Sequence, residues 1–180
     1  MGLSIHYSGE FKQSASLYSM IEEIKDVAEL HNWDYHIFED VFDNEAFGKV
    51  EHNQDLYGIC FTPPECETVF ITFLSNGRMS NAMLLNLYGE CKDPKEKEYL
   101  YMNAVKTQYA GIEIHKLIIH LFKYLNEKYF ANFTMQDEGE YWETGDKSLL
   151  RKNFKRYTDL IEGSANATEI FPMEEGEDYE

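Results

Sequence analysis

The fold is decided by the stretch Gly111–Phe130, GIEIHKLIIHLFKYLNEKYF, whose apolar residues recur at helical spacing along its whole length. The apolar flank and its extension consist of Ile112, Ile114, His115, Leu117, Ile118, Ile119, Leu121, Phe122, Leu125 and Tyr129. An apolar arc that covers more than half of a helix needs partners on more than one side. We therefore predict a central helix about 30 Å long, enough to cross a small sheet.

Ahead of this helix, hydrophobic periodicity predicts one helix and a run of strands. Residues 3–8 alternate between apolar and polar side chains, so a strand should begin the chain and end at Gly9. A helical stripe starts near Ser16. Asn76-Gly77 predicts a hairpin, because both residues tolerate positive φ. Further strands are predicted at 33–38, 56–62, 68–74 and 83–88, while 99–107 fits a strand or a helix.

Two elements should follow the central helix. A short edge strand is predicted at residues 132–136. A last helix is predicted from about Asp146, which can act as its N-cap, to about Ile161. The apolar side of that helix consists of Leu149, Leu150, Phe154, Tyr157, Leu160 and Ile161. Its opposite side carries Lys147, Arg151, Lys152, Lys155 and Arg156. This basic face could bind an acidic partner or the chain's own acidic tail. The simpler interpretation is a helix face in contact with water only.

This order of elements predicts an α+β fold, with a mainly antiparallel sheet of about five to seven strands and about three helices. The central helix 111–130 should pack on one face of the sheet. Residues 1–166 are predicted to form a single domain. The chain from Glu169 onward carries six acidic residues and no basic one, so 167–180 is predicted to be a disordered acidic tail.

Charge limits the partners that the chain can have. It contains 33 acidic and 16 basic residues, which gives a formal net charge of −17. This sign repels phosphate backbones and anionic lipid surfaces, so we expect neither nucleic-acid nor membrane binding. No cationic start followed by an apolar run resembles a secretion signal, and 3 cysteines fit a reducing compartment. We expect a cytoplasmic protein.

Histidines are the first candidates for chemistry, and their spacing argues against a metal site. His115 and His120 would point ~140° apart on a helix, whereas two helical metal ligands need a spacing of about three or four residues. His6 and His36 have matching parity on two predicted strands, so they would share the outer face of a sheet if those strands were neighbours. The simpler interpretation places His115 at the edge of the core and His120 in solvent. No catalytic residue, metal ion or cofactor is predicted.

The cysteines are weaker candidates. Cys66 lies between Glu65 and Glu67, two carboxylates that disfavour the thiolate, so the pKa of its thiol should be raised. Cys60 lies inside a predicted strand, where it would act as a small apolar side chain. Neither residue is predicted to be a nucleophile.

The segment Asp137–Asp146, DEGEYWETGD, has the most distinctive composition in the chain. Its candidate contact residues for a ligand or partner are Asp137, Glu138, Glu140, Tyr141, Trp142 and Glu143. Paired carboxylates can perform acid–base chemistry or bind a cation. The segment lacks the alternating Asp/Asn ligands of a calcium loop. A solvated loop held against the core by its two aromatic rings is the simpler interpretation.

Four runs of the sequence carry a resemblance to other proteins. LYGICFTPPE, FLSNGRM, GIEIHKLIIHLFKYL and DEGEYWETGD together resemble a group of short acidic bacterial proteins with a domain of unknown function. The resemblance covers most of the chain and implies a bacterial, cytoplasmic origin. It implies no activity, ligand or catalytic residue.

Two functions from different classes are consistent with these features. The first is a non-enzymatic binding or protein-interaction module, because the chain is acidic and rich in aromatic residues (13 Tyr, 12 Phe and 2 Trp). Its partner would be a protein with a basic surface; a toxin that needs neutralising is such a partner by analogy only. The alternative is a hydrolase that uses carboxylates of 137–146 with His115 or His120.

The strands predicted at 56–62 and 68–74 are apolar on both faces. A sheet with one face in water should alternate cleanly between apolar and polar residues. If the helices cover one face only, the second face must be shielded by the 39–55 loop, by a ligand, or by a second copy of the chain in a homodimer.

Overall fold

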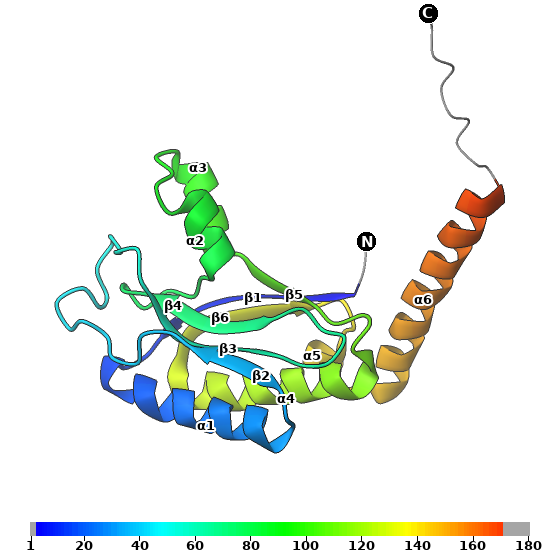
Figure 1. Cartoon of the computed structure of the whole chain (residues 1–180), viewed down its shortest axis with the longest axis horizontal. Helices are drawn as coiled ribbons and strands as arrows, with labels where there is room; N and C mark the ends of the chain where they lie inside the picture. The colour runs from blue at the N-terminus through cyan, green and yellow to red at the C-terminus, as the bar shows by residue number, and fades with distance from the viewer. Residues whose placement is uncertain (1–2, 171–180) are drawn as a thin grey trace, which may run out of the picture.

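The computed structural model describes residues 3–170 and shows an α+β protein with two three-stranded antiparallel sheets (Figure 1). Its six strands are β1 Ser4–Phe11, β2 Asp34–Ile37, β3 Leu56–Thr62, β4 Val69–Leu74, β5 Asn103–Lys106 and β6 Phe130–Asp137. One sheet has the order β5-β1-β6 and the other has the order β2-β3-β4. The predicted antiparallel α+β class is confirmed, and β6 lies at a sheet edge as predicted. The strands divide between two sheets, however, instead of forming one.

Six α-helices lie in the described residues, where about three were predicted from periodicity. They are α1 Leu17–Leu30, α2 Ala82–Tyr88, α3 Pro94–Lys97, α4 Gly111–Tyr129, α5 Tyr141–Thr144 and α6 Lys147–Ile170, with the 3₁₀-helices η1 Ser14–Ser16 and η2 Glu98–Tyr101. The additional helices α2, α3 and α5 are short, and one or two turns leave little periodicity in a sequence. Residues 99–107, which fitted a strand or a helix, contain part of η2 and all of β5. No helix in the described range 3–170 is long and apolar enough to cross a membrane.

The two sheets are joined through the hairpin that follows β4. The backbone N–H of Met79 donates to the carbonyl of Gly9 (2.9 Å), and that of Phe11 donates to the carbonyl of Gly77 (2.8 Å). β1 therefore continues through Gly9 to Phe11, although its end was predicted at Gly9. The hairpin predicted at Asn76-Gly77 is confirmed, with a φ of 86° at Gly77.

The main core lies between the sheets and the helices α1 and α4, which cover the same side (Figure 1). α4 is the predicted central helix, and its fully buried apolar residues are Ile118, Ile119, Phe122 and Leu125. Leu117 and Leu121, at the centre of the predicted stripe, are only partly buried. The sequence shows how wide the apolar arc is, but the neighbouring elements decide which part of it faces the sheet.

Residues 83–88 belong to α2 and do not form the predicted strand. Asn81 caps this helix, because its side-chain oxygen accepts the backbone N–H of Leu84 at 3.0 Å. Ala, Met and Leu are strong helix formers, and the run contains no β-branched residue. A short apolar run suits a strand or a buried helix equally well by periodicity, and here the cap and the propensities favour the helix.

α2 and η2 cover one end of the second face of β3 and β4, whereas Phe70 on the same face is only partly buried. Six residues form this smaller core: Leu56, Leu74, Leu84, Leu85, Leu100 and Tyr101. Helices therefore lie on both faces of this sheet, contrary to the expectation that they cover one face only. The homodimer or ligand over the second face stays a prediction. Phe42 of the 39–55 loop packs on Tyr57 in the main core with 4.9 Å between ring centres, and only the two ends of the loop, at Glu39 and Asp55, lie beside the second face.

The C-terminal helix starts as predicted and continues further. The Asp146 carboxylate accepts the backbone N–H of Ser148 at 2.7 Å. α6 runs to Ile170, well beyond the predicted end near Ile161, and its far part extends away from the sheets (Figure 1). Leu160, predicted to be buried, is 54% exposed. Residues 167–170 of the predicted tail belong to α6, while 171–180 lie outside the described residues.

Candidate functional site

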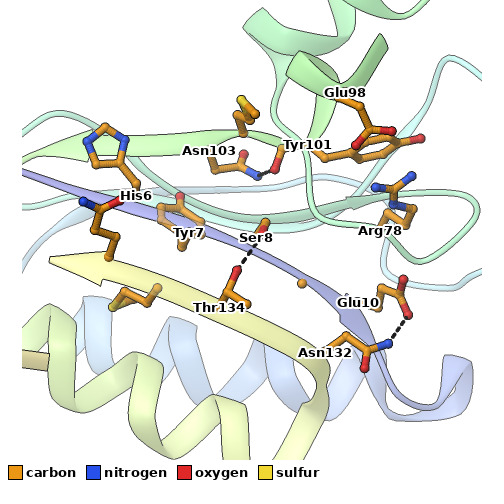
Figure 2. Close-up of a pocket in the computed structure, with 14 residues that line it drawn as sticks. His6, Tyr7, Ser8, Glu10, Arg78, Glu98, Tyr101, Asn103, Asn132 and Thr134 are labelled. Carbon is orange, nitrogen blue, oxygen red and sulfur yellow. Dashed lines mark hydrogen bonds between the residues drawn. The ribbon is translucent and has the colours of Figure 1, made fainter. Parts of the chain in front are cut away.

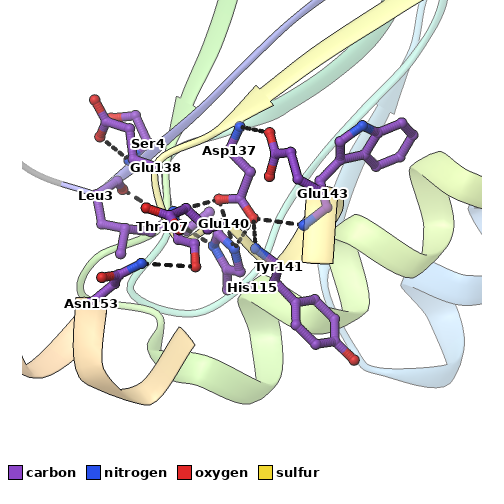
Figure 3. A network of polar contacts seen from close by, with 12 residues as sticks. Leu3, Ser4, Thr107, His115, Asp137, Glu138, Glu140, Tyr141, Glu143 and Asn153 are labelled. Carbon is purple, nitrogen blue, oxygen red and sulfur yellow. Dashed lines mark hydrogen bonds and ion pairs between the residues drawn. The ribbon is translucent and has the colours of Figure 1, made fainter. Parts of the chain in front are cut away.

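Among the predicted site residues that the structure brings together, the buried pair is His115 and Asp137 (Figure 3). The Nε2 atom of His115 lies 3.1 Å from Oδ1 and 3.2 Å from Oδ2 of Asp137. On the opposite side of the ring, Nδ1 lies 2.8 Å from the hydroxyl of Thr107. His115 comes from the start of α4, Asp137 is the last residue of β6, and Thr107 follows β5. The residue after β5, the start of α4 and the end of β6 thus meet in one chain of polar contacts.

Asp137 also organises the loop that follows β6. Its carboxylate accepts the backbone N–H groups of Gly139 (2.7 Å), Tyr141 (2.8 Å) and Trp142 (3.0 Å). Burial acts to raise the pKa of this carboxyl, but the hydrogen bond and charge of His115 and the donated N–H groups outweigh it, so the pKa is lowered. The ionised carboxylate therefore satisfies the first N–H groups of α5, which have no partner inside that helix.

The order hydroxyl, imidazole and carboxylate is the order found in acyl-transfer triads, but here the groups are enclosed. Thr107 and His115 are 0% exposed, and Asp137 is 3% exposed. The Thr107 hydroxyl also lies 3.4 Å from the carbonyl of Leu3, and it has one proton to donate. A general base must reach the proton that it removes, directly or through one water. The buried contacts therefore favour a role in holding β5, α4 and β6 together.

The other carboxylates of the acidic segment differ in how they are engaged. Glu138 accepts the backbone N–H of Ser4 at 2.7 Å and lies 3.8 Å from Nε2 of His6. Glu143 accepts a backbone N–H from the last residue of β6 at 3.1 Å. Glu140 is exposed and has a positive φ of 58°, which turns the chain into α5. Two of these three carboxylates, Glu138 and Glu143, thus accept hydrogen bonds from backbone N–H groups.

Tyr141 and Trp142 attach the acidic segment to its neighbours. The hydroxyl of Tyr141, which is 5% exposed, lies 3.3 Å from Nε2 of His120 on α4. The ring of Trp142 contacts Phe133 of β6 with 5.7 Å between centres, and the ammonium group of Lys123 lies 5.5 Å from the Trp142 ring. These contacts agree with the simpler interpretation of a loop held by two aromatic rings.

His6 and His36 do not form the pair that their parity suggested. His6 lies on β1, which is flanked by β5 and β6, whereas His36 lies on β2, which pairs with β3 in the other sheet. Strand parity predicts a face, but it does not predict which strands are neighbours. Among residues 3–170, no group of three His, Cys, Asp or Glu side chains is placed to hold a metal ion.

A groove of about 600 Å³ lies on the outer face of the β5-β1-β6 sheet and was missed by the sequence reasoning (Figure 2). At one end, the guanidinium carbon of Arg78 lies 3.3 Å from the centre of the Tyr101 ring, a cation–π contact. Elsewhere polar side chains bond to one another: Ser8 and Thr134 are 2.9 Å apart through their hydroxyls. A face of mutually bonded polar side chains is typical of the water-facing side of an antiparallel sheet.

A signal for this groove is present in the sequence. His6, Ser8 and Glu10 are alternate residues of β1, and Asn132, Thr134 and Gln136 are alternate residues of β6; all six are polar. This period of two marks one face of each strand. Arg78 and Tyr101, in contrast, come from a hairpin and from η2, and no local pattern places them at the same groove.

Two smaller predictions concern single side-chain types. Burial raises the pKa of the Cys66 thiol to about 12, and the neighbouring charge of Glu67 adds to the effect. The predicted direction is confirmed, although burial and not charge is the main cause. The five basic residues of α6 are all exposed, as expected for a solvated helix face.

Comparison with known proteins yields no match: no family model, no curated protein and no solved structure matches this chain. The resemblance to short acidic bacterial proteins therefore stays a prediction.

Proposed function

We propose that this chain is a non-enzymatic protein-interaction module of the cytoplasm whose partner presents a basic surface. The observation that carries this proposal is the composition of the segment 39–55, which contains six carboxylates and a single lysine, Lys49. All six residues are exposed: Glu39, Asp40, Asp43, Glu45, Glu51 and Asp55. None of the six forms an ion pair within the part of the chain that the structure describes.

An acidic segment of this kind favours binding for a physical reason. Like charges held close together repel one another and disfavour the compact state. A cationic partner removes that repulsion when it binds, and it is attracted from a distance at low salt. The segment is also attached to the protein, because Phe42 is buried and contacts Phe11 and Tyr57 with 5.6 and 4.9 Å between ring centres. Its carboxylates are therefore presented from a fixed base.

The hydrolase alternative is supported by one observation, the contact between His115 and Asp137. Both side chains are enclosed, and the Asp137 carboxylate is occupied by three backbone N–H groups in addition to the imidazole. The second histidine, His120, contacts the Tyr141 hydroxyl and not a carboxylate. The interaction module accounts for the charge distribution and the hydrolase does not, so the hydrolase ranks second.

Affinity capture with the tagged full chain tests the proposal. At about 50 mM salt the chain should retain a protein with a basic isoelectric point, and about 0.5 M salt should release it, because exposed charges are screened at that ionic strength. A variant that neutralises Glu39, Asp40, Glu45, Glu51 and Asp55 as amides should lose the partner. A control that neutralises five exposed carboxylates elsewhere, at Asp26, Asp34, Glu65, Glu127 and Asp159, should keep most of it. Failure to retain any partner at low salt would contradict the proposal.

A further inference from the structure

The helix α2 has apolar residues on its exposed side as well as on its buried side. Its seven residues, AMLLNLY, include no charge and a single polar side chain, Asn86. Leu84 and Leu85 are buried in the smaller core, each with 8% exposure. Met83 and Leu87, one turn apart on the same side, are 65% and 61% exposed. A helix that is apolar all round is normally enclosed, whereas α2 is enclosed on one side only.

The exposed apolar side of α2 belongs to a larger projection. Figure 1 shows α2 and α3 standing away from the sheets, on the side opposite to α1 and α4. One further large side chain of this projection is open to solvent: Tyr99 is 48% exposed, and its ring centre lies 5.5 Å from that of Tyr88 in α2. Contiguous exposed apolar surface is uncommon on soluble monomers and commonly marks an interaction site.

A groove of about 560 Å³ lies beside this helix, between α2 and the two ends of the 39–55 segment. Ala82 and Asn86 line it from α2, and Phe38 and Leu56 line it from the sheet. At ~100° per residue, Ala82 and Asn86 occupy the strip of helix surface next to Met83 and Leu87. The groove therefore borders the exposed apolar side of α2, although Met83 and Leu87 do not line it themselves.

Negative charge borders this surface on the side of the 39–55 segment. Glu39 and Asp55 line the groove itself, and both are exposed. The other four carboxylates of the segment, Asp40, Asp43, Glu45 and Glu51, lie between these two residues in the sequence. An occupant that covers the apolar surface would therefore meet carboxylates at its rim, which favours Lys and Arg side chains there.

We infer that the exposed side of α2 and its groove are the docking surface for an amphipathic helix of a basic partner, with apolar residues on one side and Lys or Arg beside them. This inference rests on the proposed function and names the surface at which the basic partner binds. Helices of this type lay their apolar face into a hydrophobic groove. A second copy of the chain fits less well, because an α2-to-α2 contact would bring two acidic segments together and like charges repel.

A designed peptide tests the docking surface directly. The probe is a synthetic helix with Leu at positions i, i+3, i+4 and i+7 and Lys elsewhere, titrated into the full chain at about 50 mM salt and followed by calorimetry. The double variant Met83→Ser, Leu87→Ser should weaken binding by about tenfold or more, because two apolar anchors are lost. The matched control is Leu30→Ser with Tyr109→Ser, at side chains 78% and 62% exposed outside α2, and it should change the affinity by less than about twofold.

Hydrogen exchange on the unmodified chain gives a second readout that does not depend on a variant. The bound peptide should protect backbone amides of 82–88 more than those of α1 or α6. Protection elsewhere, an unchanged affinity of the α2 double variant, or equal binding of a peptide with Ser in place of Leu would overturn the inference. So would light scattering that shows a dimer which the double variant dissociates, because a second copy would then be the occupant.

The same double variant separates failure of this inference from failure of the proposed function. If the cellular partner is still captured in a salt-dependent way by the Met83→Ser, Leu87→Ser chain, the interaction module stands and the α2 docking surface is wrong. If the wild-type chain captures no partner at low salt, the proposed function itself is wrong.

Discussion

The helices α4 and α2 are both apolar around much of their circumference, yet only α4 is enclosed by the chain. α4 has 19 residues and lies against β6 of the β5-β1-β6 sheet, with α5 and α6 as further neighbours. α2 has 7 residues, covers the smaller core and leaves Met83 and Leu87 in solvent. An apolar pattern thus shows which surface needs a cover, whereas helix length and position decide whether the chain itself supplies it. Four predictions test this comparison.

The largest effect is expected from Phe122→Ala in α4. Phe122 is 0% exposed and contacts the rings of Tyr7 and Phe133, with 4.7 and 5.7 Å between centres. Removing this ring should cost about 3–5 kcal/mol of unfolding free energy, because the site cannot collapse fully around the cavity. Urea denaturation measures the loss. Leu117→Ala, at a partly buried position, should cost less than half as much; an equal cost would show that α4 faces the sheet along the predicted stripe after all.

A smaller effect is expected from Leu84→Ala in α2. Leu84 is buried at 8% exposure, but its core consists of six residues at the edge of the molecule. We expect a loss of about 2–3 kcal/mol, at the lower end for buried leucines. Amide exchange should also become faster in residues 82–101 than in α4, because the projection can open by itself. A uniform increase throughout the chain would mean that both cores unfold as one unit.

Asp137→Asn tests the polar contact that attaches the start of α4 to β6. Loss of the charge-assisted bond to His115 should cost about 2 kcal/mol near pH 7. Because the pKa of Asp137 is lowered in the folded protein, its stabilisation is present above the usual value of about 3.9 and is lost as the pH falls through the lower folded pKa. The difference between wild type and variant should therefore narrow below about pH 4 in urea melts. A difference that stays constant down to pH 2 would mean that the charge of Asp137 does not contribute.

The smallest effect on stability is expected from the Met83→Ser, Leu87→Ser double variant. Both side chains are mostly in solvent, so the unfolding free energy should change by less than about 0.5 kcal/mol. Thermal and urea denaturation of the free protein measure this directly. A loss above about 1 kcal/mol would show that α2 is enclosed in the free chain, and the contrast with α4 would then disappear.

Several elements could be predicted because their signals are local. The 3.6-residue period of 111–130, the β-rich run 68–74, Asn76-Gly77 and the cap at Asp146 each depend on neighbouring residues only. These became α4, β4, the hairpin and the start of α6. The acidic segment 137–146 was also identified by composition, and the structure places its first residue in the buried contact with His115.

The rest depended on contacts between residues that are distant in sequence. No local pattern pairs Thr107, His115 and Asp137, places Arg78 over Tyr101, or separates His6 from His36 by assigning their strands to different sheets. The apolar run 83–88 had no period that separates a strand from a helix, and the local cap signal at Asn81 was overlooked.

By itself, the sequence determined the central helix, the antiparallel α+β class and the acidic character of the 39–55 segment, since periodicity and charge are properties of the chain alone. Only the tertiary structure decided which apolar surfaces are covered. Burial depends on neighbours brought together by folding, and those neighbours enclose Phe122 while leaving Met83 and Leu87 exposed.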